Sequence, residues 1–386
     1  MKTILSASLM MLLTVNLYAC VTEGDAKKGE VSLITKAIKK PDKKFIKVAL
    51  LLDTSNSMDG LINQAKAQLW DIVNELSYAR CQHESPNLEI ALYEYGNDNL
   101  PSKEGYIRQV IGFTGDLDDI SEKLFSLTTN GGNEFCGQVI EASLNQLEWG
   151  KNPDDLKLIF IAGNEPFTQG KVNYKDATTN AKEKDVVVNT IFCGNYEQGI
   201  NGMWKDGALL TNGDYMSIDH NKEIVQIVTP YDKTILRLNN QLNDTYVPYG
   251  YLGNNKKSLQ AAQDVEAEKL DEVVIVKRAV SKSSGLYKNS SWDLVDASKD
   301  KKFNYDALKR EELPKELQGK STEQIKNYVQ KKALERSSIK NQIQELNKKR
   351  NQYILKEKKT PKANNLESVM IKAIKRQAEK KNYRWD

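Results

Sequence analysis

Three short runs of apolar residues, at 45–52, 156–162 and 186–193, constrain the fold of this chain more than any other feature. A run of this length that is largely apolar, with little polar alternation, is typical of a strand buried on both faces of a parallel sheet. Parallel neighbours need a long connection, usually a helix, and helical apolar spacing lies between the runs. The sequence therefore predicts an α/β fold with a doubly wound, mostly parallel sheet.

The other elements predicted for this sheet alternate along the chain. Alternating apolar residues predict a strand at 88–95, and shorter strands are expected at 107–111 and, at an edge, 215–218. Apolar residues at helical spacing predict helices at 60–80, 118–127, 138–147 and 174–183. A closing helix is expected at 224–243, interrupted near Pro230. We assign residues 45–250 to this first domain.

Beyond Asn243 the composition changes to many Lys, Glu, Asn and Gln with few aromatic residues. Helices are predicted at 258–269, 322–356 and 366–380. Ser321 and Gln324 form a capping-box pattern at the start of the long helix. Its apolar spacing is too irregular for a coiled coil, so residues 251–386 are expected to form a charged, mainly helical region, either a hairpin or a bundle.

The first residues have the pattern of an export signal. Met1-Lys2 is followed by a largely apolar stretch, 4–17, and then by Leu17-Tyr18-Ala19-Cys20. The stretch is too short to span a membrane comfortably, and we predict a signal peptide at 1–19 and lipidation of Cys20. The alternative is simple cleavage after Ala19, with Cys20 incidental. Residues 20–44 are predicted to be a flexible tether, and the protein is expected in the cell envelope as a periplasmic or outer-membrane lipoprotein.

Composition argues against several classes of function. The net charge of +4 does not suggest nucleic-acid binding, which usually needs a concentrated basic face. Only two histidines are present, His83 and His220, and they are far apart in the sequence. A histidine-rich zinc site and a Ser-His-Asp hydrolase are therefore both disfavoured.

Asp53, Ser55 and Ser57 are the candidate metal ligands, because they follow the first buried strand directly. Such a loop can direct one carboxylate and two hydroxyl oxygens at one point. Hard oxygen ligands favour Mg²⁺, with Mn²⁺ or Ca²⁺ as alternatives. A partly open ion can then accept a carboxylate from a partner protein. The alternative is a serine-rich turn in which Asp53 or Ser57 only caps the next helix.

A buried strand that runs into Asp-x-Ser-x-Ser, followed by an amphipathic helix, resembles the metal-ion-dependent adhesion site of the von Willebrand factor A (vWA) family. The order of elements from 45 to 243 is also similar to that family. The resemblance implies a Rossmann-like vWA fold with a Mg²⁺ site that binds a protein partner. Two loops depart from the family pattern, because 128–137 replaces the usual Thr segment and Gly163 stands where the family has an Asp.

One hypothesis reconciles these departures with metal binding. Glu134 supplies the carboxylate that the third loop lacks, and Asn164 provides a neutral oxygen. The alternative is that Glu134 caps the following helix and that the pocket is metal-free or weakly occupied. Asn133, Glu165 and Tyr196 are the expected partner contacts at the rim of the site.

Cys136 and Cys193 fall near loops at the same end of the predicted sheet, and we predict a disulfide between them. Two buried thiols, or pairing with Cys81, are the alternatives, because a Cα separation is not readable from sequence.

These observations favour an envelope-anchored binding protein that is not an enzyme. One alternative is a structural envelope scaffold with a degenerate metal site. The other, less favoured, is an exported hydrolase that uses Asp53, Glu134 or Glu165, since paired carboxylates can do acid–base work.

Overall fold

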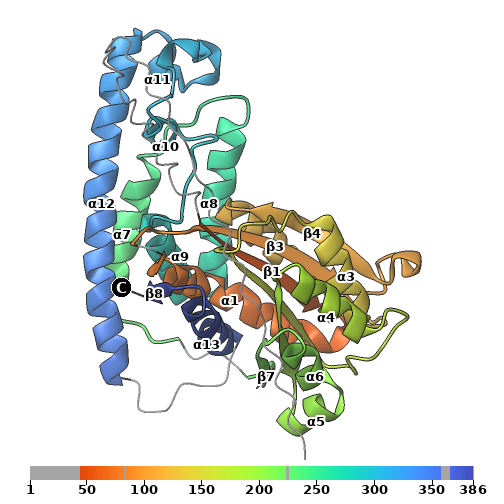
Figure 1. Ribbon diagram of the computed structural model, residues 1–386. Helices are drawn as coiled ribbons and strands as arrows, with labels where there is room; N and C mark the ends of the chain where they lie inside the picture. The colour runs from red at the N-terminus through yellow and green to blue at the C-terminus, as the bar shows by residue number, and fades with distance from the viewer. Residues whose placement is uncertain (1–43, 82, 223–225, 358–365, 386) are drawn as a thin grey trace, which may run out of the picture. The chain divides into compact units, whose positions relative to one another are not determined.

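A six-stranded mixed sheet forms the centre of the protein in the computed structural model, which describes residues 44–81, 83–222, 226–357 and 366–385 (Figure 1). The strand order is β4-β3-β1-β5-β6-β7, and only the edge strand β4 runs antiparallel to its neighbour. The strands are β1 (Phe45–Asp53), β3 (Asn87–Tyr95), β4 (Ile107–Thr114), β5 (Leu156–Gly163), β6 (Val187–Cys193) and β7 (Tyr215–Ile218). The prediction of a doubly wound, mostly parallel sheet is confirmed.

The central strand β1 shows why the sequence has a largely apolar run at 45–52. Val48, Leu50 and Leu52 enter the core on one face of the sheet, and Ala49 and Leu51 enter the core on the other. Successive side chains of a strand point to opposite faces, so a strand covered on both sides is mostly apolar and each buried polar residue in it needs a partner.

Helices cover both faces of the sheet. The first face carries α1 (Asp59–Leu76), α2 (Leu117–Phe125) and α13 (Leu366–Glu379), and the second carries α3 (Cys136–Gln146), α4 (Tyr174–Glu183) and α6 (Trp204–Leu209). A short helix, α5 (Tyr196–Asn201), precedes α6. The helices predicted at 60–80, 118–127, 138–147 and 174–183 are thus present, with shifted ends.

The predicted closing helix at 224–243, interrupted near Pro230, is helical only after the interruption; residues 226–231 are not helical, and 224–225 lie outside the described residues. Helix α7 begins only at Asp232, after Pro230, and runs to Asn243. It packs against α9 (Glu272–Ser283) and α12 (Thr322–Glu357) instead of the sheet. Helix α13 lies beside α1 and contacts β5, so the C-terminal part of the chain completes the first face of the sheet (Figure 1).

The C-terminal region is built into the first domain and does not form a separate helical bundle. Residues 43–386 make up one compact unit. Its further helices are α8 (Gly253–Leu270), α10 (Leu294–Ala297) and α11 (Lys315–Gln318), with single 3-10 turns at Asn56–Met58, Ser102–Glu104, Tyr305–Ala307 and Arg310–Glu312. A second, two-stranded sheet pairs β2 (Ala79–Cys81) with β8 (Tyr383–Trp385). The composition of the chain therefore changes near residue 250, but the residues on the two sides of this point pack together in one unit.

The long helix α12 begins as its sequence predicts. The Ser321 N–H donates to Gln324 Oε1 at 2.9 Å, and the Gln324 N–H donates back to Ser321 Oγ at 3.3 Å, which is the reciprocal capping box. In the described ranges no helix has both the length and the apolar character needed to cross a membrane. The predicted signal peptide, Cys20 and the tether up to residue 43 lie outside the described residues.

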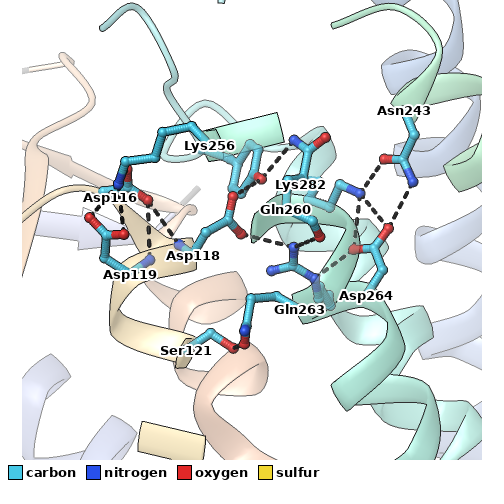
Figure 2. A network of polar contacts seen from close by, with 12 residues as sticks. Asp116, Asp118, Asp119, Ser121, Asn243, Lys256, Gln260, Gln263, Asp264 and Lys282 are labelled. Atoms are coloured by element: carbon cyan, nitrogen blue, oxygen red, sulfur yellow. Dashed lines mark hydrogen bonds and ion pairs between the residues drawn. The ribbon is translucent and has the colours of Figure 1, made fainter. Parts of the chain in front are cut away.

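A buried network of charges joins α2 to the C-terminal helices (Figure 2). Arg278 is fully buried and bridges Asp118 of α2, at 2.8 Å, and Asp264 of α8, at 2.6 Å. Lys282 is also fully buried and reaches Asp264 at 2.8 Å. Burial alone would raise the pKa of Asp264, but Lys282 and Arg278 outweigh it and hold that pKa below its usual range.

A second buried ion cluster fixes α12. Arg336 donates to both carboxylate oxygens of Asp293, at 2.5 and 3.0 Å, and its guanidinium lies 4.1 Å from the centre of the Tyr246 ring. Removing one member of such a cluster leaves a buried charge without a partner, which costs far more than the loss of an exposed ion pair.

We expect Arg278→Met to lower the free energy of unfolding by about 3–5 kcal/mol, because it leaves Asp118 and Asp264 buried without their shared cation. Urea denaturation followed by circular dichroism measures this. Arg237→Met is the matched control, since Arg237 is exposed on α7, and it should change stability by no more than about 0.5 kcal/mol. Equal effects of the two variants would show that the network does not hold the two parts of the chain together.

Candidate functional site

Asp53 is the last residue of β1 and is completely buried. Its Oδ1 accepts a hydrogen bond from the Ser55 N–H at 2.7 Å, which turns the loop back over the strand end. Its Oδ2 is buried and has no hydrogen-bond partner. Strand β1 lies between β3 and β5, where the chain order in the sheet reverses, and such a point is the usual place for a ligand in this kind of fold.

Ser55, Ser57 and Asn164 meet next to this strand end. The two serine hydroxyl oxygens are 3.5 Å apart, and Asn164 Nδ2 donates to Ser57 Oγ at 3.1 Å. The other amide atom, Asn164 Oδ1, is buried without a partner. His220 Nε2 lies 3.2 Å from the Ser57 carbonyl oxygen, so this histidine supports the loop from the side of β7.

Glu134 is the second buried carboxylate of the site, with 3% of its surface exposed. Its carboxyl group lies beside Asp53 and near the Ser55 side chain and the Glu165 backbone. Its Oε2 has no hydrogen-bond partner. The alternative in which Glu134 caps the following helix is not what the structure contains, because α3 begins after Phe135 with no side-chain cap.

Gly96 allows the two carboxylates to approach. It adopts a left-handed φ of 78°, and a Cβ atom there would lie 2.8 Å from both Asp53 Oδ1 and Glu134 Cγ. Only glycine takes this conformation without strain and leaves that space free. Neither Gly96 nor its role was predicted from the sequence.

The electrostatics of the pair are those of two carboxyl groups that cannot both ionise easily. Burial raises the pKa of Asp53 well above its usual value, and the neighbouring Glu134 raises it further. Burial also raises the pKa of Glu134. A bound divalent cation would reverse this preference, because it favours the ionised form of both groups.

The residues present fit a hard divalent cation. Asp53 Oδ2, Glu134 Oε2 and Asn164 Oδ1 are buried oxygens without partners, and the hydroxyl groups of Ser55 and Ser57 lie beside them. Carboxylate, amide and hydroxyl oxygens are the donors that Mg²⁺ and Ca²⁺ prefer. Within the described residues no group of three or more His, Cys, Asp or Glu side chains is placed to hold a metal, so any site here depends on the neutral oxygens as well.

Tyr95 explains why Gly163 replaces the Asp of the family pattern. A Cβ atom at Gly163 would lie 2.5 Å from Tyr95 Oη and 3.1 Å from Asp53 Oδ2. Tyr95 is fully buried and donates to the Ala162 carbonyl oxygen at 2.9 Å. The phenol thus fills the space that a longer side chain at 163 would need, and Glu134 brings the second carboxylate from another loop.

The predicted partner contacts lie at the surface around this site. Asn133 and Glu165 are exposed, and Tyr196 is 45% exposed at the start of α5. Trp204 is fully buried and positions the loop of Glu165, because its Nε1 donates to the Glu165 carbonyl oxygen at 2.8 Å.

The predicted disulfide between Cys136 and Cys193 is absent, and the correction has a simple cause. Cys81, Cys136 and Cys193 are all free and buried. Cys136 on α3 belongs to the core on one face of the sheet, and Cys193 on β6 belongs to the core on the other face. Residues near the same sheet edge can therefore still be separated by the sheet itself.

Comparison with known proteins supports the assignment of the first part of the chain. Residues 47–210 match the family model of the von Willebrand factor type A domain. This vWA segment contains Asp53, Ser55, Ser57, Glu134 and Asn164. No curated protein matches the chain.

Several solved structures resemble part of the chain at low identity. Proximal thread matrix protein 1 from the mussel byssus is 14% identical with a TM-score of 0.35, over 45% of this chain and 42% of that one. BatB from Bacteroides thetaiotaomicron is 17% identical with a TM-score of 0.35, over 45% and 90%. An aerotolerance-related membrane protein from Bacteroides fragilis is 15% identical with a TM-score of 0.32, over 46% and 93%. Likeness at this level carries no information about function.

We expect Gly163→Ala to destabilise the protein by about 1–3 kcal/mol, the usual cost of overpacking a tight core position. In a Tyr95→Phe background the cost should be smaller, because the variant removes the oxygen that the new Cβ meets at 2.5 Å. A double-mutant cycle measured by urea denaturation tests this. Purely additive effects would mean that Tyr95 is not what excludes a side chain at 163.

Proposed function

We propose that this protein is an exported, lipid-anchored binding module of the cell envelope whose vWA segment holds Mg²⁺ and recognises a partner protein through that ion. Asp53, Ser55, Ser57, Glu134 and Asn164 would hold the cation, and an acidic side chain of the partner would complete its coordination. The convergence of three unpartnered buried oxygens on Asp53, Glu134 and Asn164 is the observation that carries the proposal.

Without a cation, the site leaves buried polar atoms without hydrogen-bond partners, which is energetically unfavourable. Buried polar atoms in proteins are nearly always hydrogen-bonded, and each exception needs an explanation. Three such oxygens, on Asp53, Glu134 and Asn164, belong to this one site, where burial also raises the pKa values of the two carboxyl groups. A divalent ion would satisfy the oxygens and offset the two negative charges at once.

The argument for a binding role and against catalysis is chemical. A protein-bound Mg²⁺ with open coordination positions can bind an oxygen ligand without any reaction. His220 is the histidine nearest the loop in this arrangement, and its ring faces a backbone carbonyl oxygen, not a hydroxyl group that it could activate. The site therefore favours recognition over hydrolysis.

Export and lipid attachment belong to the proposal on grounds of sequence alone. The pattern of residues 1–20 is that of a lipoprotein signal, with Cys20 as the lipidated residue. Together with a Lys- and Gly-containing segment before β1, it supports a folded part that is tethered to a membrane surface in the envelope.

We expect the protein to bind Mn²⁺ or Mg²⁺, and we expect Asp53→Ala and Glu134→Gln each to weaken that binding about tenfold or more. Loss of a residue that only supports a ligand already has an effect of this size. Isothermal titration calorimetry with Mn²⁺ alone measures the affinity. Glu183→Gln is the control, because Glu183 is exposed at the end of α4 and outside the site.

The outcomes separate the proposal from its competitors. If Glu134→Gln binds Mn²⁺ as tightly as the unaltered protein, then Glu134 is not a ligand. If the unaltered protein binds neither ion, the site is degenerate and the protein acts as a structural scaffold instead.

A further inference from the structure

Five exposed carboxylates surround the candidate metal site. One follows the carboxyl end of each of the strands β1, β3, β5, β6 and β7, and all five are exposed. We call this set the acidic rim: it consists of Asp59, Asp98, Glu165, Glu197 and Asp219. Since the carboxyl ends of parallel strands meet at one edge of a sheet, the five charges gather on the face that carries Asp53.

Individual contacts tie members of the rim to the site. The Glu165 backbone lies close enough to the Glu134 carboxyl group to influence its pKa. A Cβ atom on Gly131, three residues before Glu134, would lie 3.7 Å from Asp98 Oδ2. The Asp219 carbonyl oxygen accepts from Gln64 of α1 at 2.9 Å, beside the His220 that supports Ser57.

The acidic rim forms no close ion pairs, although Asp59 acts on the pKa of Lys66 at longer range. None of its five members takes part in an ion pair with any residue that the structure describes. Acidic residues elsewhere on this fold do pair, as Glu75 with Lys375 and Asp185 with Lys381 do. The next lysine in the sequence after each rim residue is, in chain order, Lys66, Lys103, Lys171, Lys205 and Lys222, and none of these lysines forms an ion pair with the rim.

Helix capping explains only part of this arrangement. Asp59 and Glu197 lie in the first turns of α1 and α5, where a negative charge is favourable in any case. Asp98 and Glu165 lie in loops outside any helix, and Asp219 lies in a turn where its carboxylate accepts from the Asn221 N–H at 3.2 Å. Their exposure beside two buried carboxyl groups has a cost in repulsion that a binding partner would relieve.

A bound cation would not cancel the rim. If the site holds a divalent ion as proposed above, the ionised Asp53 and Glu134 already balance its two positive charges. The surrounding surface then stays negative, which opposes an acidic partner surface and attracts a basic one.

We propose that the partner protein presents lysine and arginine side chains around the oxygen group that reaches the ion, so that its docking surface as a whole is basic. This inference rests on the proposed function. Tyr196 and Met203, 45% and 42% exposed on the segment next to the site, offer apolar contact for the stems of those basic side chains. Association should then be steered by charge and weaken as salt is raised.

Three short synthetic peptides test the inference on the full chain in the presence of Mn²⁺. Each carries one central aspartate, flanked by lysines in the first, serines in the second and glutamates in the third. Fluorescence anisotropy at low salt should give the lysine-flanked peptide an affinity about tenfold or more above the serine-flanked one, with the glutamate-flanked peptide weakest. Added salt should reduce this difference.

A charge-neutralised rim is the decisive variant. Asp98→Asn, Glu165→Gln and Glu197→Gln together should remove most of the preference for lysine. The matched control replaces Glu268, Glu323 and Glu335, which are exposed on α8 and α12, by Gln and should keep the preference. The inference is overturned if the lysine-flanked peptide fails to bind, if it binds no better than the others, or if the rim variant retains the preference.

The same design separates this inference from the proposed function. Glu134→Gln and EDTA remove the ion but leave the rim intact. If the unaltered protein binds no Mn²⁺ while the rim still selects the lysine-flanked peptide, the metal proposal fails and the preference for a basic partner surface stands without it. If Mn²⁺ binds as proposed and the rim variant changes nothing, the reverse holds.

Discussion

The contact between Asp53 and Glu134, two buried carboxyl groups at the end of a parallel sheet, is the interaction on which the account of this protein depends. Burying a carboxyl group costs desolvation free energy, which a fold must offset with hydrogen bonds, an ion pair or a bound metal ion. Gly96 leaves room for the pair, and Tyr95 fills the space that a side chain at 163 would occupy. The surrounding structure is thus arranged to bring the two carboxyl groups together.

The rest of the fold supplies rigidity behind that point. Strand β1 is buried on both faces of the sheet. One of the helices that pack on these faces, α13, comes from the C-terminal end of the chain. The buried network around Arg278 joins α2 to the C-terminal helices, so the part that matches the vWA family and the part that does not are held as one unit. A binding site on such a scaffold keeps its geometry because few of its supports can move independently.

Much of the sheet could be predicted from the sequence, because strands that are buried on both faces are mostly apolar and stand out as short apolar runs. The grouping of Asp53, Ser55 and Ser57 followed from their place after such a strand, and Asn164 and Glu134 followed from the missing Asp at 163. The packing of α13 on the sheet could not be predicted. Its sequence shows an apolar helix face but does not indicate which part of the protein that face contacts. The disulfide failed for a related reason, because sequence places Cys136 and Cys193 at one edge but does not tell which face each side chain meets.

The most direct test of the central claim is an anomalous difference map from crystals of the protein grown with Mn²⁺. The account predicts a peak in contact with Asp53, with Glu134, Asn164 and the two serine hydroxyl groups around it. A map without a peak there, in which Asp53 and Glu134 still lie side by side, would contradict the account.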